Sequence, residues 1–179
     1  MKKFMWVALA LSLFVIPAHA QMAPAADVST GYSFLHLNGG AGAPGINLNG
    51  GTGSIAFNAN DWVGLVGDFG VYHGSPSSVS TTAVTYMFGP RFSYRAGGKV
   101  VPFGEALFGG SHLSASFGGA SATDNPFAYS MGGGADFAVG ATDKWTVRPE
   151  FEYVGMRENG NTQNCYRVSV GLVFHIGQK

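Results

Sequence analysis

Several segments of this chain alternate between large apolar residues and residues that are charged or very small. The last such segment, Cys165–Gly177, has its bulky residues at every second position: Tyr166, Val168, Val170, Leu172, Phe174 and Ile176. The positions between them hold Arg167, Ser169, Gly171, Val173 and His175. A period of two is that of a β-strand. Because charges oppose the bulky face, the pattern predicts a closed barrel whose apolar face contacts lipid.

Four other segments show the same opposition of faces. Their bulky sets are Val63, Leu65, Phe69 and Val71; Val84, Tyr86, Phe88, Phe92 and Tyr94; Phe127, Tyr129, Met131, Phe137 and Val139; and Trp145, Val147, Phe151 and Tyr153. The opposing sets are Asp68 and Gly70; Thr85, Arg91, Ser93 and Arg95; Ser130, Gly132, Gly134 and Asp136; and Thr146, Arg148, Glu150 and Glu152. Aromatic residues gather near the strand ends, as in the two interfacial girdles of a membrane barrel.

The pattern predicts an all-β fold, an eight-stranded antiparallel up-and-down transmembrane β-barrel. The expected strands are Val28–Leu37, Ile46–Phe57, Trp62–His73, Thr81–Arg95, Val100–His112, Phe127–Gly140, Trp145–Met156 and Cys165–Gly177. Each is long enough to cross a bilayer, which takes about 9–11 tilted residues. The inward face of the first, second and fifth strands stays open, because bulky and polar residues share a parity in each.

Short and long connections alternate along the chain. Residues 58–61, 96–99 and 141–144 are short and turn-like, whereas residues 38–45, 74–80, 113–126 and 157–164 are longer and rich in Gly, Ser, Asn and Pro. Outer-membrane barrels have short periplasmic turns and longer extracellular loops, so both termini are expected in the periplasm. The longest loop, Leu113–Pro126, is expected to be irregular and flexible, and it is the leading candidate for a functional surface.

The N-terminus has the features of a cleaved secretory signal peptide. Lys2 and Lys3 precede an uncharged run from Phe4 to Ile16, and Ala18-His19-Ala20 follows as a small-residue cleavage site before Gln21. The mature barrel domain would comprise residues 21–179. The single cysteine, Cys165, cannot form an internal disulfide.

Composition limits the class of partner. Removing residues 1–20 takes away Lys2 and Lys3 and no acid, so eight basic and ten acidic side chains remain, a formal charge of −2. This balance argues against a nucleic-acid partner. No later run approaches the roughly 20 apolar residues of a spanning helix, so a membrane protein made from this chain must use strands.

These residues resemble the eight-stranded outer-membrane β-barrel domain family, typified by the transmembrane half of outer membrane protein A. The most specific match is the last strand, where Ser169, Gly171, Phe174 and Ile176 fit the pattern polar-x-Gly-x-x-hydrophobic-x-hydrophobic. The resemblance implies that the barrel-assembly machinery recognises this segment. The chain departs from the family by ending in Gly177-Gln178-Lys179 instead of an aromatic residue. It also stops after the last strand, so the resemblance implies no peptidoglycan-binding domain.

The barrel interior is expected to hold a paired charge network. Its predicted members are Asp68, Arg91, Arg95, Glu105, Asp136, Arg148, Glu150, Glu152 and Arg167, four positive against five negative. Eight strands enclose a space that side chains can fill, and an unpaired charge there costs several kcal/mol, roughly. The sequence therefore predicts a salt-bridged plug. A gated proton or ion path through rearranging pairs is the functional alternative.

The sequence also contains candidate residues for hydrolytic or acyl-transfer catalysis and for a histidine metal site. Some barrels of this kind resemble lipid-modifying acyltransferases or deacylases, and His112-Leu113-Ser114 has suitable residue types, with Glu158 or Asp124 as the candidate orienting acid. His36, His73 and His112 end alternate strands, but strand spacing keeps them about 9–10 Å apart, so they are expected to be polar rim residues. A secreted soluble β-barrel carrier is a further alternative.

The sequence thus predicts a small integral protein of the cell outer membrane with a structural or surface-interaction role through four extracellular loops. It is not expected to be an enzyme or to need a cofactor. Its expected partners are outer-membrane lipids, lipopolysaccharide and the barrel-assembly machinery. The sequence does not identify the surface ligand.

Overall fold

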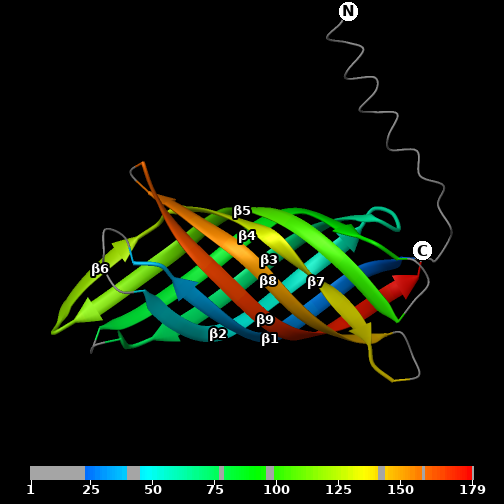
Figure 1. The fold of residues 1–179 in the computed structure, drawn as a ribbon, viewed down its shortest axis with the longest axis horizontal. Coiled ribbons are helices and arrows are strands. Elements are labelled where there is room, and N and C mark those ends of the chain that lie inside the picture. The colour runs from blue at the N-terminus through cyan, green and yellow to red at the C-terminus, as the bar shows by residue number, and fades with distance from the viewer. Residues whose placement is uncertain are drawn as a thin grey trace, which may run out of the picture.

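A computed structural model describes residues 23–39, 45–76, 79–95, 99–140, 144–158 and 160–178. The predicted signal peptide and its cleavage site lie outside these residues. The strands are β1 Pro24–Leu37, β2 Ile46–Asn58, β3 Val63–Gly74, β4 Ser80–Ser93, β5 Val100–Phe117, β6 Ala120–Asp124, β7 Phe127–Ala138, β8 Trp145–Glu158 and β9 Asn161–Gln178 (Figure 1). Among the residues that the structure describes, no helix is long and apolar enough to span a membrane.

The strands close into an antiparallel barrel. Their order is β4-β3-β2-β1-β9-β8-β7-β5-β6, and an additional pairing of β4 with β5 joins the two ends of the wall. The closing seam of the chain is formed by β1 and β9, which pair from Pro24↔Gln178 to Leu37↔Cys165. Because β6 pairs only with β5 within the described residues, the barrel itself has eight strands, as predicted.

The five predicted face assignments are confirmed. On β9, Arg167 is 2% exposed, whereas its neighbour Val168 is 45% exposed and Leu172 is 52% exposed. The same opposition holds on β4, where Arg91 is buried and Phe88 is 64% exposed. In a water-soluble barrel these apolar side chains would be buried in the interior. An outer surface that exposes them is therefore suited to contact with the hydrocarbon of a membrane.

The structure also determines the three open faces. On β1, Leu35 and Leu37 point inward and Tyr32 points outward. On β2, Leu48, Ser54 and Ala56 are inward, and on β5 the inward set is Phe103, Glu105 and Leu107. Periodicity could not decide these strands because their inward residues include large apolar side chains as well as polar ones.

Two predicted loops are wrong. Leu113–Pro126 is not an irregular loop, because β5 continues to Phe117 and returns as β6, with Leu113↔Asp124 and Phe117↔Ala120 in register. The last connection is shorter than residues 157–164, since β8 and β9 pair out to Glu158↔Asn161. Serine-rich and glycine-rich sequence does not exclude a strand when its backbone groups find a partner in register.

The two ends of the barrel differ. We call the end where β1 begins and β9 ends the terminal end, and the end where β5 turns into β6 the hairpin end (Figure 1). At the hairpin end, β5 and β6 extend the wall as a ribbon, in which β5 stays paired with β4 as far as Ser80↔Ser116 (Figure 1). Outward aromatic residues pair near both ends, with Trp145 on Phe174 toward the terminal end and Tyr129 on Tyr153 toward the hairpin end. These pairs form the predicted girdles.

Candidate functional site

The interior contains two layers of different chemistry. On β8, which runs from the terminal end, Arg148, Glu150 and Glu152 come first and Val154 and Met156 follow. On strands that run from the hairpin end to the terminal end, the apolar residues come first; on β9, for example, Cys165 precedes Arg167. The apolar layer, at the hairpin end, consists of most of the buried apolar cluster, namely Leu35, Leu37, Leu48, Tyr72, Ala83, Met87, Leu107, Ala128, Val154, Met156 and Cys165. The other two members of the cluster, Ala56 and Val66, lie toward the terminal end beside Asp27. The charged layer, toward the terminal end, consists of Asp27, Asp68, Arg91, Glu105, Asp136, Arg148, Glu150, Glu152, Arg167 and His175, with Arg95 at its margin.

Arg167 of β9 is the centre of the charged layer. Its Nε donates to Glu152 on β8, and its Nη1 donates to Asp68 on β3 at 2.6 Å. The same Nη1 also lies 3.3 Å from the hydroxyl of Tyr72, a member of the apolar layer. Glu152 in turn accepts from Ser130 at 2.8 Å. One guanidinium therefore joins β9 to β8 and to β3 on the far side of the barrel, which braces the wall from within.

Two more arginines share one aromatic ring. Arg91 donates to Glu105 at 2.7 Å, and Arg148 donates through two nitrogens to Asp136 at 2.6 and 2.7 Å. The guanidinium carbons of Arg91 and Arg148 lie 4.5 and 4.7 Å from the ring centre of Phe103. A cation over an aromatic face is stabilised by the ring quadrupole. The ring of Phe103 thus contacts two guanidinium groups, each of which is also paired with an acid.

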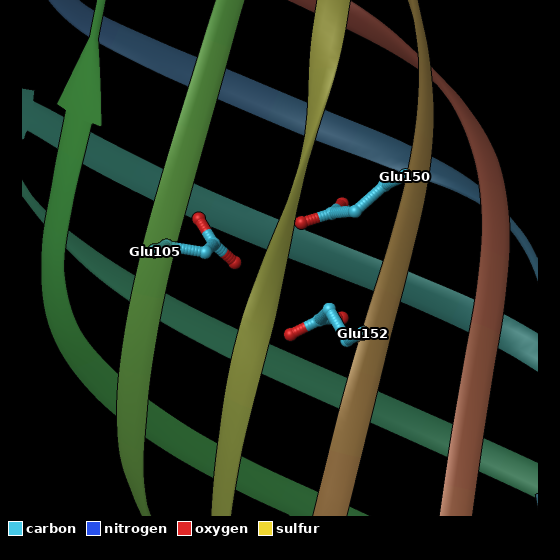
Figure 2. Close-up of side chains that lie close together, drawn as sticks. All are labelled: Glu105, Glu150 and Glu152. Atoms are coloured by element: carbon cyan, nitrogen blue, oxygen red, sulfur yellow. The ribbon is translucent and has the colours of Figure 1, made fainter.

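Three glutamates of the charged layer converge (Figure 2). Glu105 comes from β5 and Glu150 and Glu152 come from β8, and one carboxylate oxygen of each lies within 4.8 Å of the others. The neighbouring β7 makes room with glycine: a Cβ at Gly132 would lie 2.6 Å from Cγ of Glu152. Glu105 and Glu152 are bound by Arg91 and Arg167, but Glu150 has no ion pair among the described residues, and its buried Oε1 accepts no hydrogen bond there.

At the terminal end, two residues join the network that the sequence did not include in it. Asp27 of β1 bonds His175 of β9 at 2.6 Å and Asn58 at 3.1 Å. The predicted member Arg95 reaches Asp27 only at 3.9 Å and donates to the carbonyl of Asp61 at 2.7 Å. Asp27 was missed because it precedes the predicted first strand, Val28–Leu37, whereas β1 begins at Pro24; the parity of β9 already placed His175 inward.

The apolar layer is the larger omission. Leu35, Leu48 and Leu107 are fully buried. Cys165 is buried among them, consistent with its lack of a disulfide partner. The three leucines occupy strands whose faces were open, so no sequence signal separated an inward leucine from a lipid-facing one. The interior is therefore a charged network covered by an apolar layer, and not a charged plug alone.

The chain is similar to known outer-membrane proteins in sequence as well as in fold. The sequence profile of the outer membrane protein β-barrel domain matches residues 6–174. The chain belongs to this family. No curated protein sequence matches the chain.

Solved structures of outer-membrane barrels share the fold. Neisserial surface protein A (NspA) superposes with a TM-score of 0.72 at 13% identity, covering 85% of this chain and 97% of that one. Ail, the attachment invasion locus protein of Yersinia pestis, gives 0.62 at 18% identity, with 86% and 100% covered. The N-terminal β-barrel domain of Pseudomonas aeruginosa OprF gives 0.58 at 14% identity, with 84% and 98% covered. At these identities the likeness concerns the fold.

The residues predicted as an assembly signal in this outer-membrane barrel all lie on β9. Ser169 is buried inward, opposite Glu150, and Ile176 faces outward. Gly171 lies opposite Gly31 of β1, where the two backbones approach so closely that a Cβ on Gly31 would collide with the other strand. The strand that carries the motif is therefore the one that closes the chain on itself.

The histidines at the hairpin end bond to neighbouring polar side chains. Nδ1 of His36 lies 2.6 Å from Asn47, that of His73 lies 3.1 Å from Thr82, and that of His112 lies 2.7 Å from Asn125. The orienting partner of His112 is thus an amide, where a hydrolytic triad uses a carboxylate.

Proposed function

We propose that this barrel is an integral outer-membrane protein that presents its hairpin end to the outside and acts through surface contacts. The observation that supports this most is the β5–β6 ribbon, which continues the wall beyond the rim as a paired structure (Figure 1). Its base is pinned by the bond from Ser111 N to Pro126 O at 3.0 Å. A braced, protruding ribbon offers a partner a surface whose shape is set before binding.

The filled interior favours contact over transport. Arg167 spans the lumen, and the apolar layer covers it on the hairpin side. A porin-like solute path needs a wider barrel than eight strands provide. Ail, by its name, is an attachment protein, and it shares this fold. These observations support a structural and adhesive role.

The proposal is tested by shortening the ribbon without opening the barrel. Leu113 and Asp124 are already paired, so replacing Ser114–Thr123 with Asn-Gly should close a two-residue hairpin at that level. Cells producing this variant should lose adherence to epithelial monolayers relative to cells producing the full chain. Unchanged heat-modifiable migration on a gel controls for folding. Equal adherence of both strains would refute the surface role.

Compartment and orientation are part of the same proposal. We expect export with cleavage before Gln21, recognition of Ser169, Gly171, Phe174 and Ile176 by the barrel-assembly machinery, and contact of the outer face with lipids and lipopolysaccharide. An epitope inserted at Gly119 should bind antibody on intact cells, and one at Gly97 only after permeabilisation. The reverse result would invert the orientation.

A second candidate, a gated proton or ion path, is favoured by Glu150, whose buried Oε1 accepts no hydrogen bond among the described residues. It predicts intermittent conductance in planar bilayers that Glu150→Gln abolishes. A silent wild-type barrel would remove this candidate and leave the surface role intact.

A further inference from the structure

A closed barrel has no open strand edge, but the β5–β6 ribbon creates one. β5 is paired on both sides, with β4 as far as Ser80↔Ser116 and with β6 as far as Phe117↔Ala120. Within the described residues, β6 is paired on one side only. All of its residues, Ala120–Asp124, are exposed. An open edge presents unpaired backbone groups that another strand can join.

The turn determines which backbone groups face this edge. Gly118 and Gly119 both have positive φ, 57° and 88°, as a two-residue type I′ turn requires. In such a hairpin the two residues that flank the turn, Phe117 and Ala120, exchange both of their backbone hydrogen bonds. Every second pair away from the turn does the same, so Ala115↔Ala122 and Leu113↔Asp124 are also hydrogen-bonded pairs. The hydrogen bond from Ser111 N to Pro126 O fits this alternation, because it joins the next pair in the same series. The N–H and C=O groups of Ser121 and Thr123 therefore point away from β5, into the open edge.

The open edge continues the barrel wall. β7 follows β6 after Asn125-Pro126, and Phe127 and Tyr129, of the same parity as Ser121 and Thr123, pair with Arg157 and Gly155 of β8. β8 ends at Glu158 and turns back into β9. The space beside β6 is thus the place that a longer β8 would fill.

We propose that an uncharged, extended polypeptide segment of a second protein pairs antiparallel with β6 at this place. This inference rests on the proposed surface role and names its mode of recognition. Two donors and two acceptors on alternate residues match the main chain of another strand. The edge lacks the lysine, proline or bulge with which exposed edges commonly oppose pairing.

The hairpin end has too few charged residues to recognise a partner by charge. The four connecting segments, residues 38–45, 74–80, 113–126 and 157–164, contain three charged residues: Asp124, Arg157 and Glu158. Ail has been crystallised with a heparin analogue, sucrose octasulfate. A polyanion of that type needs a cluster of basic residues, whereas these four segments contain one arginine, Arg157. Main-chain pairing therefore fits the hairpin end better than binding of a sulfated sugar.

The experiment measures backbone amide exchange in the full-length mature protein in phospholipid nanodiscs. Without a ligand, the amides of Ala120 and Ala122 should exchange slowly and those of Ser121 and Thr123 fast, because only the former are bonded to β5. The probe is an end-blocked neutral peptide of alternating Thr and Val. Binding should slow exchange at Ser121 and Thr123 by at least about tenfold. The same peptide N-methylated on its pairing edge should have no effect.

The matched variants are Thr123→Pro and Thr123→Val. Proline removes an outward N–H without removing a β5–β6 bond, so it should abolish peptide protection, while valine keeps the N–H and should retain it. Ser121→Pro serves as a second variant, and slow exchange at Ala122 confirms an intact ribbon. No protection at saturating peptide, or equal binding by the proline and valine variants, overturns the inference. Protection that rises with barrel concentration alone would assign the edge to a second copy, and also overturns it.

Adherence assays separate this inference from the proposed function. If the shortened ribbon abolishes adherence and Thr123→Pro leaves it intact, edge pairing is wrong and the surface role stands. If Thr123→Pro lowers adherence as the shortened ribbon does, and Thr123→Val does not, both are supported. If none of the three changes lowers adherence, the surface role itself fails.

Discussion

The charged layer and the apolar layer fill the same barrel by different physics. In the charged layer, acids and arginines bind in specific geometries, as Arg167 does with Glu152 and Asp68. In the apolar layer, Leu35, Leu48 and Leu107 are buried without directional bonds. Deleting one partner of a buried ion pair exposes the other to a low dielectric, whereas deleting a methyl group leaves a cavity. The two layers should therefore fail differently.

The largest effect is expected at Arg167. Arg167→Met should lower the free energy of unfolding by about 3–5 kcal/mol, because Asp68 and Glu152 would remain buried without their cation. Urea unfolding of barrels refolded in lipid vesicles measures the loss. Arg157→Met, at an exposed position, is the matched control and should change little.

A triple variant sharpens this test. Arg167→Met combined with Asp68→Asn and Glu152→Gln removes all three charges, and it should recover much of the lost stability because no buried charge stays uncompensated. A triple variant less stable than Arg167→Met alone would show that packing, and not charge, is what Arg167 contributes.

In the apolar layer, Leu35→Ala should cost about 2–5 kcal/mol through lost burial and a residual cavity. The control is Leu172→Ala on the neighbouring strand, where lipid can occupy the vacated space. The same unfolding measurement compares them. Equal losses at both positions would mean that the layer is not packed as described.

The outward and inward faces of one strand provide the next comparison. Leu172→Arg places a cation in hydrocarbon and should cost about 2–4 kcal/mol near the midplane. Ser169→Arg points inward opposite Glu150, the one glutamate of the trio without an ion pair among the described residues, and should cost less. If the inward arginine proves clearly the more destabilising in vesicle refolding, the charged layer has no room for another cation.

The smallest effect should distinguish two glutamates on one strand. Glu150→Gln replaces a carboxyl group that no arginine binds among the described residues, and it should not lower stability, because no ion pair is lost. Glu152→Gln removes an acceptor of Arg167 and should be clearly more destabilising. The reverse order would show that Glu150 is compensated by a group that the described contacts do not include.

Prediction from the sequence succeeded where one face of a strand is uniform. On β4, β8 and β9, the aromatic residues face out, and parity alone assigned Arg91, Arg148, Glu152 and Arg167 to the interior, where they are buried. It left β1, β2 and β5 undecided, because large apolar side chains face both lipid and lumen on these strands. The inward leucines of the apolar layer were missed for that reason, and Asp27 was missed because it precedes the predicted strand Val28–Leu37. The β5–β6 ribbon was missed because Ser, Ala and Gly have weak intrinsic strand preference.

The sequence by itself determined the barrel, the number of its wall strands and most of its inward charges, because the lipid-facing surface requires an apolar side chain at every second position. The tertiary structure decided which acid meets which arginine, which strands bury leucine inside, and where the wall continues as a ribbon. These features depend on register between strands far apart in the chain, as with Asp27 and His175 or Asp68 and Arg167. Alternation along a strand specifies the face of a residue, but only closure of the barrel specifies its neighbours.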